Sequence, residues 1–161
     1  AIDRLAQSHG LSGAKSKFHA GLLETRFGGH KALLMQPMTY MNKSGISVAA
    51  AASFFKVDVS GILVVHDELE LPFGTVGYRL GGGLGGHNGL RSVAERVGSK
   101  DFARLRIGIG RPRGGSVSSY VLSQFNSEEK AVLERVLDAA ADMLEGVLSG
   151  SYKTEVKRTV L

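Results

Sequence analysis

Residues 62–97, ILVVHDELELPFGTVGYRLGGGLGGHNGLRSVAERV, hold the most informative pattern in this 161-residue chain. Four consecutive aliphatic residues, Ile62 to Val65, are typical of a buried strand. That strand runs into His66, Asp67 and Glu68. Because functional groups in α/β sheets gather at the carboxyl ends of strands, we expect a site where this strand emerges.

The same stretch continues with a second strand, a glycine-rich loop and a helix. Thr75–Leu80 has the composition of a strand, and residues 81–86 are almost entirely glycine. Glycine tolerates positive φ and lets another molecule approach the main chain closely. After His87 and Asn88, apolar residues recur at helical spacing. We expect this loop and the start of the helix to belong to the site.

Residues before this stretch predict a helix end, a hairpin and a further helix. Residues 1–8 have one apolar face and are closed by His9-Gly10, and residues 11–17 are expected to form a loop. Two strands, 18–27 and 30–36, flank a Gly-Gly turn. Pro37 ends the second strand, and an alanine-rich helix is expected over 46–55.

Residues after this stretch predict one more strand and a long amphipathic helix. Residues 102–110 alternate apolar with basic or small residues, and a basic loop follows at 111–115. Asn126 or Ser127 is expected to cap a helix that ends at Gly146 or Gly150. Strands alternating with helices predict one α/β domain over 1–161, a three-layer αβα sandwich with a mixed, mostly parallel twisted sheet.

Composition narrows the classes of function. Twenty Lys and Arg against fifteen Asp and Glu give a net charge of +5, which favours an anionic partner such as nucleic acid. The chain has no cysteine, so disulfides and thiolate metal sites are excluded. No apolar run approaches the ~20 residues of a membrane span, and we expect a cytoplasmic protein without membrane contact.

A second informative segment, PMTYMNKSG, occupies residues 37–45. In the simpler interpretation Thr39 or Asn42 caps the following helix, while Tyr40 and Met41 are core residues. The functional interpretation places an amide and two apolar side chains at a strand-to-helix corner that faces the site. The sequence pattern leaves both open.

The sequence matches two common functional motifs, a dinucleotide-binding loop and a metal-ligand set, only weakly. Gly81, Gly83 and Gly86 match the G-x-G-x-x-G dinucleotide pattern with Asp101 downstream, but so many glycines make the match nearly unavoidable. An NAD-dependent oxidoreductase therefore remains a minor alternative. His66, Asp67 and His87 lack the spacing of metal ligands, so we expect no metal. A carboxylate at the end of a buried strand would instead orient an imidazole by accepting its hydrogen bond.

Basic residues gather around the glycine-rich loop and the strand after it. Such residues form either an ordinary solvated face or a phosphate-binding rim, which the bidentate guanidinium suits. The residues concerned are Arg79, Arg104, Arg106, Arg111 and Arg113.

The chain resembles the bacterial-type peptidyl-tRNA hydrolases in four segments that follow the family's order. These are PMTYMNKSG (37–45), HDELELPFG (66–74), GGGLGGHNGLRS (81–92) and FARLRIGIGRP (102–112). The resemblance implies a monomeric α/β enzyme that hydrolyses the ester between a peptide and the 3′ ribose of tRNA. It implies peptidyl-tRNA as the partner and neither a metal nor an organic cofactor.

The resemblance also assigns roles to individual residues. Asp67 corresponds to the acid that holds the catalytic histidine in its basic form. The residues that correspond to the family's peptidyl-tRNA contacts, or that lie beside them, are Tyr40, Met41, Asn42, His87 and Asn88. The phosphate rim would comprise Arg79, Arg106, Arg111 and Arg113.

One part of the family pattern does not occur in this sequence. The family begins with a strand, a G-x-G-N-P-G loop and a T-R-H-N segment whose histidine is the general base, and none of these motifs is present in 1–161. Because Asp67 would then have no imidazole to orient, we expect a native N-terminal segment to be missing and the sheet to have a gap. The alternative is a non-catalytic RNA-binding relative of the same fold.

Overall fold

The computed structural model describes all residues, 1–161, and contains two β-sheets and five α-helices. The elements in chain order are α1 (Ile2–Ser8), β1 (Lys15–Lys17), β2 (Ala20–Phe27), β3 (His30–Pro37), η1 (Met41–Lys43), α2 (Ser44–Phe55), η2 (Val59–Gly61), β4 (Leu63–Glu68), β5 (Thr75–Leu80), α3 (Asn88–Val97), β6 (Ala103–Gly108), α4 (Val117–Val121), α5 (Ser127–Leu148) and β7 (Val156–Thr159).

The first sheet is antiparallel, with the order β1-β2-β3. Gly28 and Gly29 have φ of 52° and 82°, which is the backbone of a tight hairpin turn, so the predicted hairpin is confirmed. The predicted loop over 11–17 is partly wrong, since Lys15–Lys17 pair with β2. The turn into β2 uses Phe18 and His19 at positive φ, and neither residue type indicates such a turn.

The second sheet has the order β4-β6-β5-β7. The α/β class and the mixed sheet are confirmed, but "mostly parallel" is wrong because only β4 and β6 run parallel. The short segment 69–74 reverses the chain between β4 and β5, so β5 runs against β6. The C-terminal residues 156–159, whose conformation the sequence pattern did not determine, add an antiparallel edge strand.

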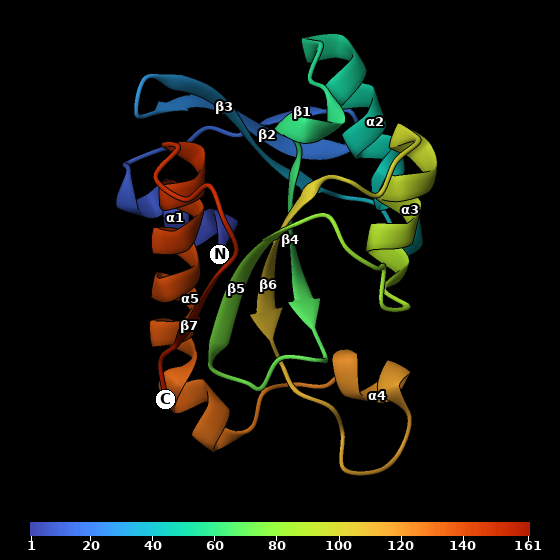
Figure 1. Ribbon diagram of the computed structural model, residues 1–161, viewed down its shortest axis with the longest axis vertical. Helices are drawn as coiled ribbons and strands as arrows, with labels where there is room; N and C mark the ends of the chain where they lie inside the picture. The colour runs from blue at the N-terminus through green and yellow to red at the C-terminus, as the bar shows by residue number, and fades with distance from the viewer.

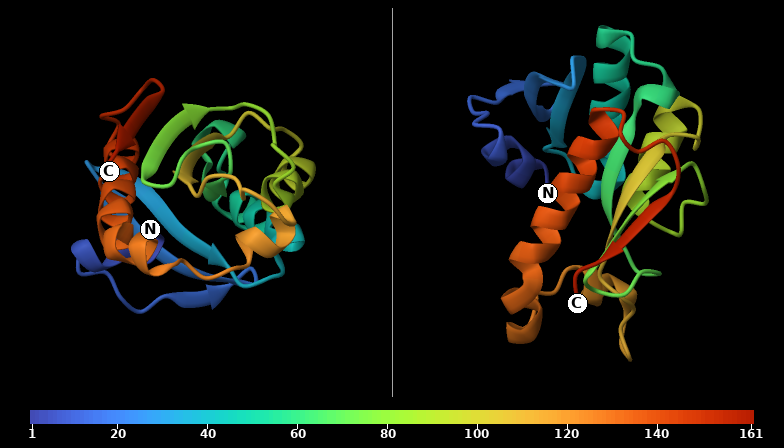
Figure 2. Two further views of the ribbon diagram at one scale, coloured as in Figure 1. Left: turned by 90° about the horizontal axis from the view of Figure 1, so that it is seen from below. Right: turned by 60° about the vertical axis from the view of Figure 1, so that its left-hand side comes forward.

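Helices cover both faces of the second sheet, as the three-layer prediction requires (Figures 1 and 2). On one face α5 packs Val136, Met143 and Leu144 into the main core. On the other face α3 packs against Phe102 in a smaller core, and α2 lies beside α3. The side chains of β4 alternate between these cores, as expected for a strand between two helical layers.

The outer edge of β4 has no strand partner. β4 pairs only with β6, so its aliphatic residues 63–65 are half-buried, whereas the sequence predicted a fully buried strand. A groove of about 1390 Å³ runs between this edge and β3 of the first sheet. The free edges of β3 and β4 thus face each other across an apolar groove.

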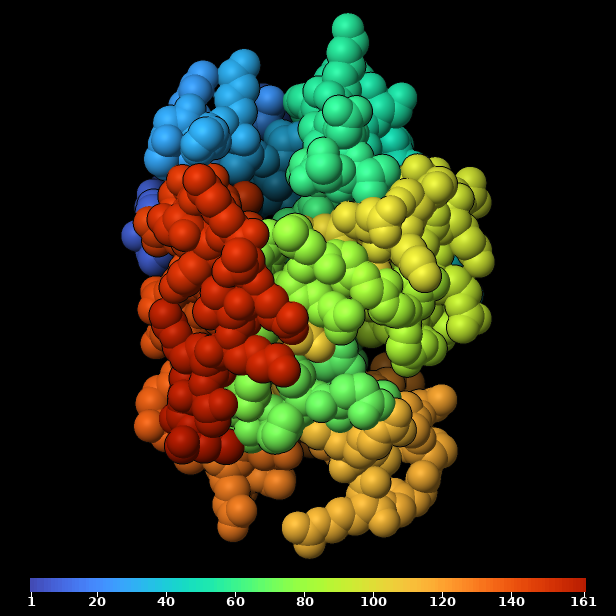
Figure 3. Space-filling model, viewed as in Figure 1, coloured from blue at the N-terminus to red at the C-terminus, as the bar shows by residue number.

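Helix caps show which local predictions hold. Of the two predicted caps of α5, Asn126 is the N-cap, and it forms a capping box with Glu129 that was not predicted. Neither Thr39 nor Asn42 caps α2, because the 3-10 turn η1 intervenes and Lys43 occupies the N-cap position without a side-chain bond. The short helix α4 was not predicted, and in the space-filling view its segment projects at the lower end of the molecule (Figure 3).

Candidate functional site

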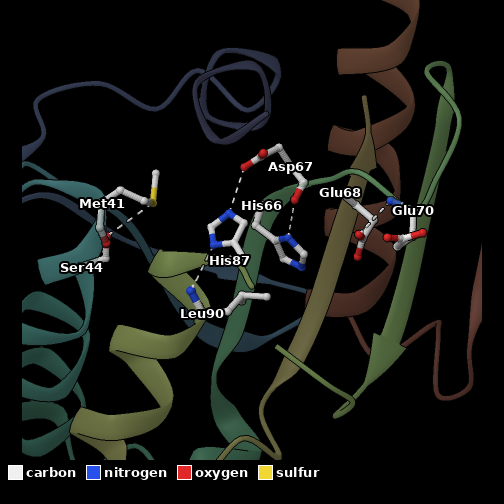
Figure 4. A network of polar contacts seen from close by, with 8 residues as sticks. All are labelled: Met41, Ser44, His66, Asp67, Glu68, Glu70, His87 and Leu90. Atoms are coloured by element: carbon white, nitrogen blue, oxygen red, sulfur yellow. Dashed lines mark hydrogen bonds and ion pairs between the residues drawn. The ribbon is translucent and has the colours of Figure 1, made fainter. Parts of the chain in front are cut away.

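Asp67 and His87, which both line the groove, form a hydrogen-bonded pair (Figure 4). Asp67 lies near the carboxyl end of β4, and His87 is the N-cap residue of α3. His87 Nε2 is 2.9 Å from Asp67 Oδ1. The expectation that Asp67 has no imidazole partner within this chain is therefore wrong.

The second ring nitrogen of His87 determines which tautomer is present. The backbone N–H of Leu90 donates to His87 Nδ1 over 3.2 Å, so Nδ1 carries a lone pair. Nε2 of the neutral ring then carries the proton and donates it to Asp67. Both nitrogens are occupied, and His87 in this arrangement has no free lone pair with which to accept a proton from water.

The hydrogen bond from His87 keeps the Asp67 carboxylate ionised. It lowers the pKa of Asp67 from its ordinary 3.8, against the opposing effect of partial burial. No other side chain donates to this carboxylate. Asp67, which lines the groove, is thus a charged acceptor, as a residue that stabilises an imidazolium must be.

His66 supports the pair from within the protein. Its ring is only 8% exposed, and its Nδ1–H donates to the backbone carbonyl of Asp67 over 2.7 Å. The rings of His66 and His87 lie edge to face with centroids 5.1 Å apart. Burial lowers the pKa of His66, so the ring is neutral, and its Nε2 has no partner. The expected position of His66 at the strand end is confirmed, but its contacts with Asp67 and His87 could not be read from the sequence because they depend on the packing of α3 beside β4.

Met41 is the one residue of the 40–42 segment that lines the groove with Asp67 and His87. Its sulfur lies so close to Gly89 that a Cβ at position 89 would be 2.7 Å from it. A Cβ there would also lie 2.9 Å from Cε1 of His87, so glycine at position 89 leaves room for both side chains. Tyr40, Asn42 and Asn88 are exposed and lie outside the groove lining, with Tyr40 80% exposed.

The predicted arginine rim is only partly present. Arg113 is exposed, Arg79 is half-buried, and Arg111 is exposed but forms an ion pair with Glu70. Arg106 is buried and pairs with Glu155 over 3.2 Å, so placing it on an exposed rim was wrong. Arg106 points from β6 toward Glu155, in the segment that leads into β7. The prediction failed because the sequence did not indicate that this C-terminal segment lies beside β6.

The dinucleotide interpretation does not fit the topology. That motif requires a parallel βαβ unit, whereas the strands that flank α3 are antiparallel. The structure contains no cluster of three or more histidine, cysteine or acidic side chains that could hold a metal ion. None of its helices combines the length and apolar character needed to cross a membrane.

Known proteins resemble this chain over most of its length. A family model described as peptidyl-tRNA hydrolase matches residues 1–160. A peptidyl-tRNA hydrolase of Geotalea daltonii is 45% identical over 144 residues, which are 89% of this chain and 75% of that protein. One from Frankia casuarinae is 45% identical over 158 residues, 98% of this chain and 80% of that protein.

Solved structures show the same fold. A crystal structure of peptidyl-tRNA hydrolase from Acinetobacter baumannii superposes with a TM-score of 0.84 at 36% identity, covering 93% of this chain and 77% of that one. The arrangement of sheets and helical layers thus matches a known class of hydrolytic enzymes with an α/β fold. The chain belongs to the peptidyl-tRNA hydrolase family.

Proposed function

We propose that this chain hydrolyses the ester bond between the peptide and the tRNA of peptidyl-tRNA, and so recycles tRNA from aborted translation. The observation that carries the proposal is the ionised Asp67 carboxylate, which lines the groove and is hydrogen-bonded to an imidazole. Such a carboxylate fixes an imidazole tautomer and stabilises the cation that forms during general-base catalysis. Membership of the peptidyl-tRNA hydrolase family supplies the substrate class.

The reaction needs one proton carrier and a carboxylate. A water oxygen adds to the ester carbonyl carbon while an imidazole takes the water proton. The bond to the 3′ ribose oxygen then breaks, and the imidazolium returns the proton to that oxygen. Asp67 stabilises the imidazolium throughout, and the products are a peptide acid and a tRNA with a free ribose hydroxyl.

His87 is not our first candidate for the base, because both of its ring nitrogens are occupied. We assign the base to a histidine of the family's T-R-H-N segment, with Asp67 as its acceptor. The groove supports this assignment, since it lies between the free edges of β3 and β4 and its size and apolar lining suit one more strand. The family's N-terminal strand would occupy it.

We propose that residues in and beside the groove contact the substrate. Met41 and His87 line the groove, and the residues next to them in the sequence, Tyr40, Asn42 and Asn88, are exposed. Amides both donate and accept hydrogen bonds, so they recognise a peptide main chain independently of its side chains. Arg79, Arg111 and Arg113 would contact tRNA phosphates.

The wider setting follows from this function. We propose that residues 1–161 form one peptidyl-tRNA hydrolase-like domain that acts as a monomer in the cytoplasm, where its substrate arises. We assign it no metal or organic cofactor, since water, an imidazole and a carboxylate complete the reaction.

The occupied nitrogens of His87 also favour a second candidate, a member of the family that binds tRNA without cleaving it. Peptide release from peptidyl-tRNA should be measured for this chain alone and for the chain preceded by the family's strand and T-R-H-N segment. Our proposal predicts release by the extended chain that is lost when the segment's histidine is replaced by alanine. Salt-sensitive tRNA binding with no release in either form would establish the binder instead.

A further inference from the structure

Arg104 is a buried cation at the centre of the second sheet. It lies on β6, paired in register with Val64 of β4 and Arg79 of β5, and is 2% exposed. The structure contains no ion pair between Arg104 and a carboxylate. A buried charge must be compensated by hydrogen bonds, so the partners of this guanidinium indicate what it holds in place.

Those partners are backbone carbonyls on both sides of α3. Arg104 Nη2 donates to the carbonyls of Gly82, over 2.9 Å, and Lys100, over 2.8 Å, and Nη1 donates to that of Gly83. Gly82 and Gly83 belong to the loop that enters α3, and Lys100 belongs to the loop that leaves it. One side chain thus ties both connections of α3 to the sheet.

The entering loop has few other restraints. Within residues 81–86 the backbone hydrogen bonds are those from Gly81 to Phe102 and from His87 to Leu84. Glycine loses more conformational entropy on ordering than any other residue, so such a loop is flexible unless it is held. Charge-assisted bonds to carbonyls are about twice as strong as neutral ones, which makes Arg104 the principal tether.

This loop leads directly into the site. His87 follows it as the N-cap of α3, and its 2.9 Å bond to Asp67 joins α3 to β4. The guanidinium also lies 4.8 Å from the ring centroid of Phe102, around which α3 packs its apolar face. The position of His87 and Asn88 relative to Asp67 therefore depends on the same residue that anchors the loop.

We infer that Arg104 is a positioning residue for the hydrolytic site: it fixes the glycine-rich loop and α3 so that His87 keeps its hydrogen bond to Asp67. The positioning role follows from the contacts of Arg104 alone. Only the statement that the site hydrolyses peptidyl-tRNA rests on the proposed function. Arg104 itself is too deeply buried to contact a macromolecular substrate.

The test compares Arg104→Met and Arg104→Lys with Arg158→Met, a matched control that removes an arginine from β7 in the same sheet. Amide hydrogen exchange of residues 82–88 and the imidazole ¹⁵N signals of His87 are recorded together with kcat and KM. In Arg104→Met we expect exchange of the loop to accelerate by at least ~10-fold and the fixed His87 tautomer to be lost. Arg104→Lys keeps the positive charge but lacks the planar, forked guanidinium. It should retain part of the slow loop exchange and part of the fixed His87 tautomer.

In a chain that releases peptide, kcat should fall by ~10–100-fold in Arg104→Met with a smaller change in KM, since misplacement by ~1 Å has effects of this size. Unchanged loop exchange and an unchanged His87 tautomer in Arg104→Met would overturn the inference. If Arg104→Met does not fold, the same two signals in Arg104→Lys decide it. Loop and imidazole changes in a chain that never hydrolyses peptidyl-tRNA would support the positioning role and refute the proposed function.

Discussion

Asp67 and His87 differ in how many of their hydrogen-bonding positions are still free. His87 uses Nε2 to donate to Asp67 and Nδ1 to accept from Leu90. Asp67 keeps its charge and has only one side-chain donor, so it can accept a second hydrogen bond. We therefore propose that the reaction depends on the Asp67 carboxylate and that His87 is its hydrogen-bonded partner within the chain.

Asp67→Asn should leave the geometry of the pair nearly intact, because the amide oxygen still accepts from His87 Nε2. It removes the charge that stabilises an imidazolium, and we expect kcat/KM for peptidyl-tRNA to fall by at least ~100-fold. His87→Ala should have a smaller effect, about 10-fold, if the base lies elsewhere. Steady-state rates of both variants distinguish these roles, and a larger loss in His87→Ala would identify His87 as the base.

His66 makes stability depend on pH. Burial lowers its pKa in the folded state below the ordinary 6.5, so the unfolded chain binds more protons as the pH falls past 6.5. The contribution is complete above 6.5 and is lost as the pH falls through the lowered pKa. The nearby charges that modulate it are His87, Glu68 and Asp67, and Asp67 itself titrates only below its ordinary 3.8.

The measurement is the free energy of unfolding against pH, by urea titration, for the parent chain and His66→Leu. The variant should be less stable overall, having lost the bond to the Asp67 carbonyl, but its slope between 6.5 and the lowered pKa should be flatter. The exposed His30→Gln serves as the control and should keep the parent slope. Parallel curves for the parent and His66→Leu would rule out this account of His66.

Elements that depend on local signals were predicted well. The hairpin β2–β3 was recognised from two glycines at its turn, and α5 from its apolar stripe and the cap expected at Asn126 or Ser127. Elements defined by distant partners were not: β1 and β7 are strands only because β2 and β5 lie beside them. The same difference between local signals and distant partners holds for the site. Asp67 was recognised at the end of its strand, but its hydrogen bond to His87 was not predicted.

The close approach of α2 and α3 is an element-scale feature with a direct test. A Cβ at Gly45 would lie 2.0 Å from the carbonyl oxygen of Ser92, and the Ser92 hydroxyl accepts from the Gly45 N–H over 2.9 Å. Gly45→Ala must push the helices apart and should cost about 1–3 kcal/mol of unfolding free energy. Ser53→Ala, an exposed change in the same helix, should change it by less than about 0.5 kcal/mol.

Chemical denaturation of both variants checks this expectation. Because α2 follows Met41 and α3 follows His87, the Gly45→Ala chain should also show a disturbed Met41 methyl signal by NMR. A Gly45→Ala chain as stable as the Ser53→Ala chain would mean that the two helices are not held at this distance in solution.

On the scale of the whole molecule, the groove and the charge distribution define the two halves of the proposed site. The groove runs between the two sheets beside Asp67, and the two exposed arginines of the proposed rim, Arg111 and Arg113, lie in the loop that follows β6. With a net charge of +5 the chain attracts a polyanion in general, whereas individual arginines contribute separable contacts. Salt dependence distinguishes these two contributions.

Arg113→Gln should weaken tRNA binding and lower the slope of log affinity against log salt concentration by about 0.7–0.9, as expected for one phosphate contact. Lys130→Gln, which removes an exposed cation from the start of α5, is the control for general charge and should change the slope less. Binding isotherms at several salt concentrations give both slopes. Equal slopes for the two variants would remove Arg113 from the phosphate contacts.

The central claim is that Asp67 of this chain supports hydrolysis of peptidyl-tRNA. The most direct measurement is the initial rate of peptide release by the chain preceded by the family's strand and T-R-H-N segment, with Asp67 and with Asp67→Asn. We predict release in the first case and a fall of at least ~100-fold in the second. Equal rates in the two proteins, or no release by the extended parent chain, would contradict the claim.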